Sequence, residues 1–284
     1  MSSYGNNQNP FAAPNAYGGY ATGPSSSSNV ELAGRGYGIF LAALDNSFLD
    51  ETAAELEATF KVPVIKFPID LTHEKAALTI KEYIETEGIC LKILVNNAGF
   101  GRGDFFENIP LETYHTMMGL NNRVMVELCY HLLPVLKKNK SAYILNLGSM
   151  ESFLPMPVKA IYTASKHFVL AFSLALGTEL SGTGVSVSIL CPGPVVTNED
   201  GMRRIKNNGA RARLVVMMPE EVAPIAINGL LSGKKVIVPG KINKLILFMN
   251  KLLPLSLKMV LLKKIGISFL PKESLEDERF KNQA

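Results

Sequence analysis

Apolar and polar positions follow two periods along this chain, one typical of buried strands and one typical of amphipathic helices. Short apolar runs predict strands at 37–43, 62–68, 91–95, 143–147 and 185–190. Segments with apolar residues every three or four positions predict helices at 49–60, 74–86, 112–133 and from 160 onward. This alternation predicts an α/β fold in which a doubly wound parallel sheet forms the middle of a three-layer α/β/α arrangement.

Small and polar residues collect where three of these strands end. The segments are Asn96-Asn97-Ala98-Gly99, Gly148-Ser149 and Cys191-Pro192-Gly193-Pro194. Ligands of open α/β sheets bind at the carboxyl ends of the strands, and small residues let the backbone approach them closely. The sequence therefore predicts a binding site at this edge of the sheet.

Tyr162 and Lys166 lie four residues apart in a segment of helical period. This spacing places both side chains on one face of a helix. A phenol has a pKa near ~10 when unperturbed, and a fixed ammonium beside it moves that pKa toward the neutral range. Such a pair suits acid–base catalysis, although tyrosine and lysine also meet at this spacing on solvated helices.

Together and in this order, the motifs resemble the short-chain dehydrogenase/reductase family, in particular its hydroxysteroid dehydrogenase and ketoacyl reductase-like members. The resemblance covers about residues 20 to 240. It implies a Rossmann-like fold and an NAD(P)-dependent oxidoreductase that interconverts a carbonyl and a hydroxyl. Tyr162 would exchange a proton with the substrate oxygen, Ser149 would hold that oxygen, and Lys166 would hold the ribose and lower the pKa of Tyr162. Asn121 would hold a water that relays protons toward Lys166; the alternative is an asparagine at a helix kink.

The resemblance also implies a set of cofactor contacts. Asp70 would accept a hydrogen bond from the adenine amine, or it would cap the helix that follows Thr72. The full set of implied contacts is Thr22, Gly23, Ser25, Asp70, Asn97, Ala98, Gly99, Tyr162, Lys166, Pro192, Gly193, Val195 and Thr197. No metal site is expected.

The glycine-rich phosphate loop of the family is altered here. Thr22-Gly23 starts the motif, but its second and third glycine positions fall on Ser27 and Asn29. The segment before it, 16–21, is a glycine-broken strand, and the helix after it is expected only at 30–35. A fault at the start of the gene model, a rebuilt loop and a loss of cofactor binding all remain open. Gly36 is expected to cap that helix rather than to form a replacement loop.

Cofactor choice depends on the end of strand 37–43. The acidic position that selects NAD holds Ala43, the basic position that selects NADP holds Leu44, and Asp45 follows. The expected cofactor is NADP or NAD, with NADP favoured. Apolar residues at 153–157 and 195–196 favour a lipophilic carbonyl or alcohol as substrate.

The two ends of the chain differ from the middle. Residues 1–20 are rich in Asn, Gly, Ser, Pro and Ala and predict a disordered tail, followed by the main domain at 21–240. Residues 241–284 form a basic apolar tail, and the interval from Glu221 to Glu273 holds nine lysines and no acidic residue. Its apolar runs are shorter than the ~18–20 residues that span a bilayer. Helices broken at Pro254 are expected, lying on an anionic membrane surface, on a subunit or on their own domain.

Charge and cysteine content narrow the cellular setting. The net charge of +4 is mild and gives no support for nucleic-acid binding. No secretory signal pattern is visible, and three unpaired cysteines in apolar segments predict free buried thiols in a reducing compartment. We therefore expect a cytoplasmic or membrane-associated protein, and by resemblance a homo-oligomer.

Two other functions are alternatives to the oxidoreductase. One is a non-catalytic relative with a degenerate phosphate loop, acting as a membrane-surface or partner-binding protein. The other is a serine hydrolase, but Gly148-Ser149-Met150-Glu151-Ser152 lacks the second glycine of a nucleophile elbow.

Overall fold

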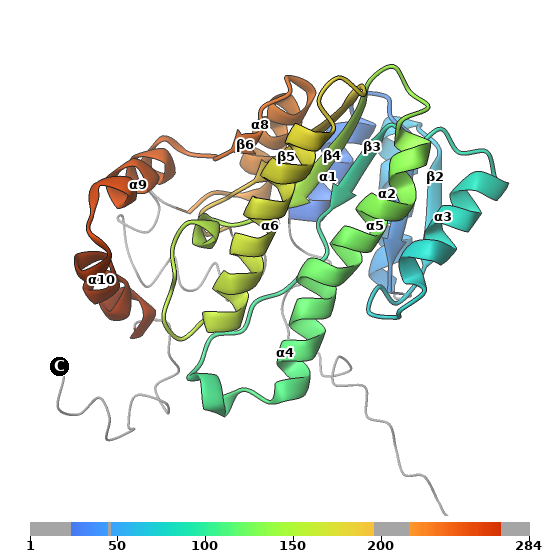
Figure 1. Cartoon of the computed structure of the whole chain (residues 1–284). Coiled ribbons are helices and arrows are strands. Elements are labelled where there is room, and N and C mark those ends of the chain that lie inside the picture. Colours follow the sequence, from blue (N-terminus) through green and yellow to red (C-terminus); the bar gives the residue numbers. More distant parts are fainter. Residues whose placement is uncertain (1–23, 45–46, 196–215, 268–284) are drawn as a thin grey trace, which may run out of the picture.

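The computed structural model describes residues 24–44, 47–195 and 216–267. Within these ranges, six parallel strands form the middle layer (Figure 1). They are β1 (Ile39–Ala43), β2 (Val64–Pro68), β3 (Ile93–Asn96), β4 (Ala142–Leu147), β5 (Val185–Leu190) and β6 (Val236–Ile237). Several begin one or two residues later than the apolar runs predict, because an apolar run does not fix the residue at which pairing begins.

Helices cover both faces of the strands, which confirms the predicted three-layer α/β/α fold. On one face, a core that includes Ile80, Leu128 and Leu176 joins the strands to α3 (Ala76–Thr86), α5 (Val124–Leu136) and α6 (Ala160–Glu179). On the other face, a core that includes Leu32, Leu56 and Ile227 joins them to α1 (Pro24–Ala33), α2 (Ser47–Phe60) and α8 (Pro219–Leu231).

The strands form two sheets in the described residues. β1 pairs with β2, and the second sheet has the order β3-β4-β5-β6. β1 and β3 nevertheless line one common cavity, so the two sheets continue one another across it. The strand predicted at 16–21 lies outside the described residues, as does the tail predicted at 1–20.

The first helix differs from the prediction at its start and agrees at its end. α1 begins at Pro24 rather than at residue 30, because proline fits the first helical position and serines are tolerated in a first turn whose N–H groups lack partners within the helix. Gly36 has a φ of +83°, and its N–H donates to the carbonyl oxygen of Ala33 at 2.9 Å. The expected glycine cap is therefore confirmed.

The C-terminal helices α9 (Lys241–Leu252) and α10 (Leu255–Ile267) are separated at Pro254, as predicted. They project from the side of the molecule that also carries α6 and β6 (Figure 1). In the part of the chain that the structure describes, α6 alone is long and apolar enough to cross a membrane. Val169 and Ser173 of α6 are buried, and the helix packs on β5.

All three cysteines are free, but only two match the expectation of burial. Cys129 and Cys191 are buried, whereas Cys90 is exposed. Cys90 precedes β3 instead of lying within it, because that strand begins at Ile93.

Candidate active site

Tyr162 and Lys166 lie in the first two turns of α6, beside the end of β4. The Nζ atom of Lys166 is 5.8 Å from the centroid of the Tyr162 ring. Lys166 is buried, and its Nζ donates a hydrogen bond of 2.8 Å to the carbonyl oxygen of Leu147. That bond fixes the ammonium between α6 and the strand that leads to Ser149.

Ser149 follows β4 in extended conformation and begins a short 3₁₀ helix, Met150–Ser152. Its Oγ accepts from the N–H of Glu151 at 3.1 Å, and its own N–H donates to Oγ of Ser152 at 3.2 Å. This reciprocal cap holds the serine hydroxyl in place. The Ser149 side chain also lies close enough to Tyr162 to lower the pKa of the phenol.

The pKa of Tyr162 is nevertheless raised, contrary to the expectation that Lys166 would lower it. Burial is the largest cause, and the carboxylate of Glu151 adds to it. Burial also lowers the pKa of Lys166, to about 8, so the ammonium is itself a weakened partner. Glu151 pairs with Lys159 at 2.8 Å, and the Nζ of Lys159 is 5.9 Å from the Tyr162 ring centroid. At neutral pH the phenol is therefore protonated and able to donate a proton.

Asn121 lies where one long predicted helix is interrupted. A π-helical turn, Gly119–Arg123, separates α4 (Leu111–Met118) from α5. Asn121 therefore lies at an irregular turn of the helix, as its alternative interpretation predicts. Such turns are frequent at functional sites. Asn121 is buried, and its Nδ2 donates to the carbonyl oxygen of Phe100 and to Oγ of Ser165, each at 3.0 Å. Its Oδ1 accepts from the N–H of Phe100, also at 3.0 Å.

These bonds clamp the loop that follows β3 onto α6. A methyl group on Gly99 would lie 2.6 Å from Oδ1 of Asn121 and 3.7 Å from Nζ of Lys166. A methyl group on Gly101 would lie 2.9 Å from the Tyr162 ring. Glycine is thus required where this loop passes the candidate catalytic side chains.

A second buried network ties the strands together below the site. Asn96 donates to Oδ1 of Asn146 at 2.8 Å, and Asn146 donates to Oγ of Ser173 at 2.9 Å. The three residues come from β3, β4 and α6. They fix the register in which the ends of both strands face α6.

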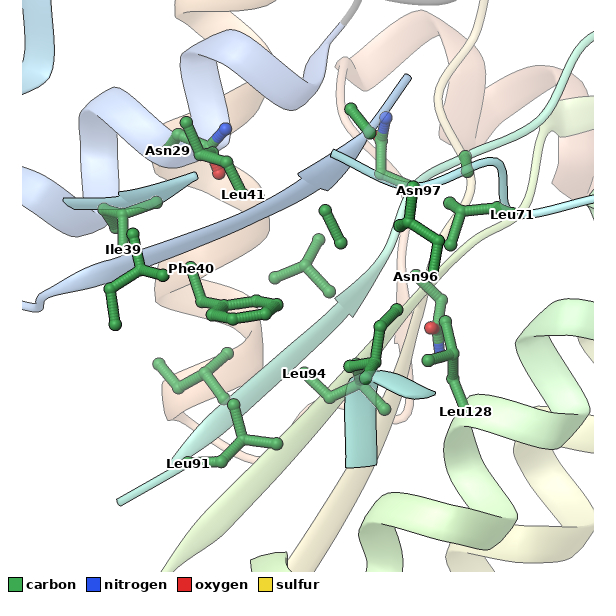
Figure 2. A pocket seen from close by; sticks show the side chains of 18 of the residues that line it. Asn29, Ile39, Phe40, Leu41, Leu71, Leu91, Leu94, Asn96, Asn97 and Leu128 are labelled. Carbon is green, nitrogen blue, oxygen red and sulfur yellow. The ribbon is translucent and has the colours of Figure 1, made fainter. Parts of the chain in front are cut away.

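A cavity of about 600 Å³ extends from these strand ends down between β1 and β3 (Figure 2). Its polar end includes Asp70, Asn97, Ala98 and Gly99, which the sequence assigns to cofactor contacts. Its deeper part is apolar, lined by Ile39, Phe40, Leu41, Leu91, Leu94 and Leu128. Tyr162 and Ser149 do not line it, so among the described residues the cavity extends away from the candidate catalytic side chains.

Asp70 does not cap a helix. Its Oδ1 accepts from the N–H of Thr72 at 2.8 Å and from the Thr72 hydroxyl at 2.7 Å, which closes a turn. α3 begins only at Ala76, after Lys75. The helix-cap alternative is therefore wrong, because Asp70 lies five residues before the N-cap Lys75 and its carboxylate closes a local turn with Thr72 instead.

Four of the remaining implied cofactor contacts lie within the described residues, and three lie outside them. The carbonyl oxygen of Pro192 accepts from the N–H of Met150 at 2.9 Å, which joins the turn after β5 to Ser149. Gly193 faces Asn243 of α9, and Val195 bridges to Met217. Ser25 lies in the first turn of α1. Thr22, Gly23 and Thr197 lie outside the described residues.

The sequence did not predict several neighbours of the candidate catalytic side chains. Ser165, Ser152 and the Glu151–Lys159 ion pair all contact or flank them. Ser165 lies three residues after Tyr162, a spacing that places both on one face of the helix, and this was the available signal. The others depend on long-range packing that local pattern does not show. In the described ranges, no three His, Cys, Asp or Glu side chains gather as metal ligands.

The comparison with protein families decides the relationship. Residues 19–208 match the model of the short chain dehydrogenases. The chain belongs to this family. A very-long-chain 3-oxoacyl-CoA reductase-A of Danio rerio is 30% identical over 190 residues, which cover 66% of this chain and 59% of the relative. A very-long-chain 3-oxoacyl-CoA reductase of Coprinopsis cinerea is 31% identical over 56% of this chain and 47% of the relative.

The match thus spans about half of the length of these curated relatives. Among solved structures, a short-chain dehydrogenase from Sphingobium yanoikuyae in complex with NADPH has a TM-score of 0.68 and 28% identity, over 77% of this chain and 85% of that chain. A 7beta-hydroxysteroid dehydrogenase has a TM-score of 0.73 over 81% of this chain and 88% of that chain; at 22% identity it supports the fold.

Proposed function

We propose that this short-chain dehydrogenase family member is an NAD(P)-dependent oxidoreductase that interconverts a carbonyl and a hydroxyl on a lipophilic substrate. The observation that carries the proposal is the placement of Tyr162 and buried Lys166 on one face of α6, with Ser149 beside Tyr162 at the end of β4. Ser149 holds the substrate oxygen by a hydrogen bond, and the hydroxyl of Tyr162 exchanges a proton with it.

The residues near this triad fit a nicotinamide cofactor. Gly99 and Gly101 keep the loop after β3 free of side chains beside Lys166 and Tyr162. In the proposal, Lys166 holds the ribose hydroxyls, Asn97–Gly99 and Pro192–Val195 hold the nicotinamide half, and Asp70 holds the adenine. When bound, the cofactor supplies or accepts the hydride. The solved relative from Sphingobium yanoikuyae carries NADPH, which supports NADP as the favoured choice.

The protonation state of Tyr162 favours reduction of a carbonyl. Burial keeps Tyr162 protonated at neutral pH, so it begins as a donor. Asn121 clamps the loop at Phe100 to α6 and thereby keeps this loop in place beside Tyr162 and Lys166. A water held near Asn121 would relay protons to Lys166.

The proposal extends to substrate and setting. Apolar side chains such as Phe153 and Met156 lie between Ser149 and Tyr162, which supports a lipophilic substrate. The names of the curated relatives, very-long-chain 3-oxoacyl-CoA reductases, point the same way. We place the protein in the cytoplasm as a homo-oligomer, with the tail 241–284 in contact with membranes.

A second candidate is a non-catalytic relative that binds a membrane or a partner. The observation that favours it is the start of α1: Ser27 and Asn29 occupy helical positions where the family has glycines of the phosphate loop. Side chains at these positions limit the approach of a pyrophosphate to the helix N-terminus.

Thermal unfolding with excess NADPH, and separately with NADH, tests both candidates. A ligand at about 100 times its Kd stabilises the fold by roughly 2.7 kcal/mol, which gives a clear shift in Tm. A shift followed by turnover of a lipophilic ketone supports the oxidoreductase. A cooperative transition that neither cofactor moves would replace it with the non-catalytic candidate.

A further inference from the structure

We propose that the outward faces of α9 and α10 bind an anionic lipid surface and turn the substrate side of the catalytic site toward it. The binding itself is independent of catalysis, while its consequence for substrate access rests on the function proposed above.

α9 packs one face on the domain and exposes an apolar face on the opposite side of the helix. Asn243 and Leu247 are buried, and Nδ2 of Asn250 donates to the carbonyl oxygen of Phe153 at 3.2 Å, so this face packs on the domain. At about 3.6 residues per turn, Leu245, Phe248 and Leu252 point the opposite way. They are 57%, 58% and 65% exposed.

α10 repeats this arrangement. Leu262 and Gly266 are buried, and a methyl group on Gly266 would lie 2.8 Å from the carbonyl oxygen of Pro157. Leu257, Val260 and Leu261 lie on the other side of the helix and are exposed. Half of the exposed large hydrophobic side chains in the described residues belong to these two helices, which is more than scattered surface residues explain.

Charge identifies the occupant of this surface. The two helices carry Lys241, Lys244, Lys251, Lys258, Lys263 and Lys264, and they contain no acidic residue. Helices with an apolar face and flanking lysines lie in the interface of membranes that contain anionic lipids. A second copy of the chain would bring lysines against lysines, and that repulsion disfavours a symmetric interface.

The same helices contact both segments that flank the catalytic triad. α9 and α10 bond or pack against Phe153 and Pro157, which lie between Ser149 and Tyr162. Asn243 packs against Gly193 in the turn after β5. A membrane bound to the outer faces of the helices therefore lies next to the segments through which a lipophilic substrate reaches Tyr162.

Cosedimentation of the full chain with vesicles tests the binding. Vesicles of phosphatidylcholine with phosphatidylserine should bind the protein, phosphatidylcholine alone should bind it much less, and added salt should weaken the binding. The double variant Phe248→Ser/Leu252→Ser and the double variant Lys244→Glu/Lys251→Glu should each lose roughly tenfold or more in affinity. All four side chains are exposed, so both variants should fold.

Matched controls use exposed residues elsewhere. Leu78→Ser/Tyr130→Ser and Lys137→Glu/Lys138→Glu should bind vesicles as the wild type does. Equal binding to both vesicle types, equal loss in the controls, or a concentration-dependent dimer that only the α9 variants abolish would overturn the proposal. The last result would identify the surface as a subunit interface.

An activity measurement tests the consequence separately. A lipophilic ketone dissolved in anionic vesicles should be reduced more slowly by Phe248→Ser/Leu252→Ser than by the wild type, and a water-soluble ketone equally fast. Vesicle binding without turnover of any ketone would contradict the proposed function and leave the lipid surface standing. Equal rates on both ketones would contradict the orientation toward lipid.

Discussion

The ammonium of Lys166 is bonded to the carbonyl oxygen of Leu147 at 2.8 Å, in a site that excludes water from it. One hydrogen bond to a neutral acceptor does not offset the loss of hydration, and burial lowers the pKa of Lys166 to about 8. The lysine therefore changes its charge within the range in which the enzyme would be studied, and it does so beside the candidate proton donor.

Stability should report this titration. Between pH about 8 and about 10.5, the unfolded chain holds a proton on Lys166 that the folded chain has lost, so the free energy of unfolding rises with pH. Lys166→Met removes that rise. The difference between wild type and variant should grow by on the order of 2–3 kcal/mol across this window.

Denaturant unfolding at several pH values measures the difference, with Lys137→Met as an exposed control that should show no such growth. Loss of the hydrogen bond to Leu147 lowers the free energy of unfolding of Lys166→Met by the same amount at every pH. Only the dependence of the difference on pH therefore reports the titration. Parallel curves for wild type and Lys166→Met would mean that the buried lysine does not titrate in this window.

Tyr162→Phe should reduce turnover by about 100-fold or more, because it removes the proton donor. The fold and the shift in Tm caused by NADPH should persist, since the ring still fills its place against Gly101. Tyr114→Phe is the matched control: its hydroxyl donates to the carbonyl oxygen of Phe106 at 2.9 Å, away from the site. Equal turnover in Tyr162→Phe and wild type would remove Tyr162 from the mechanism.

Burial is the main cause of the raised pKa of Tyr162, and the carboxylate of Glu151 adds to it; the same carboxylate also raises the pKa of Lys166. Glu151→Gln therefore lowers both pKa values and leaves Lys159 as an uncompensated cation near the ring. The alkaline limb of kcat/KM for carbonyl reduction should move to lower pH. Glu127→Gln, which alters an ion pair on α5, should leave the limb in place. An unmoved limb in Glu151→Gln would show that another group sets it.

Local pattern was sufficient for the fold because strands and helices here differ clearly in period. It also brought Tyr162 and Lys166 together, since residues four apart on a helix share a face whatever surrounds them. The cap at Gly36 followed from the same local chemistry.

What the sequence could not supply was the effect of tertiary neighbours. The pKa of Tyr162 depends on burial and on Glu151, eleven residues away and on another element. Asp70 does not cap a helix, which was one of its two predicted roles, because its carboxylate accepts from Thr72 in a local turn. α1 begins at Pro24, although its serine-rich first turn carries little helical signal.

The contact between Gly99 and Asn121 gives the sharpest test of the clamp. A methyl group on Gly99 meets Oδ1 of Asn121 at 2.6 Å, and that atom is held by a hydrogen bond to Phe100 and by burial. Gly99→Ala must break the clamp or move the loop, which should cost about 1–3 kcal/mol of stability. It should also lower kcat more than it changes KM for a ketone, because the loop positions Tyr162 and Lys166 rather than the substrate.

Gly119→Ala is the matched control in the same region. Gly119 has a helical φ of −56°, and a methyl group there meets nothing within 4 Å. Alanine should therefore be neutral or stabilising by up to about 1 kcal/mol. If Gly99→Ala loses stability relative to Gly119→Ala but keeps wild-type kcat, the bonds of Asn121 hold the structure without positioning the catalytic side chains. Loss confined to Gly99→Ala ties catalysis to the loop that Asn121 fastens to α6.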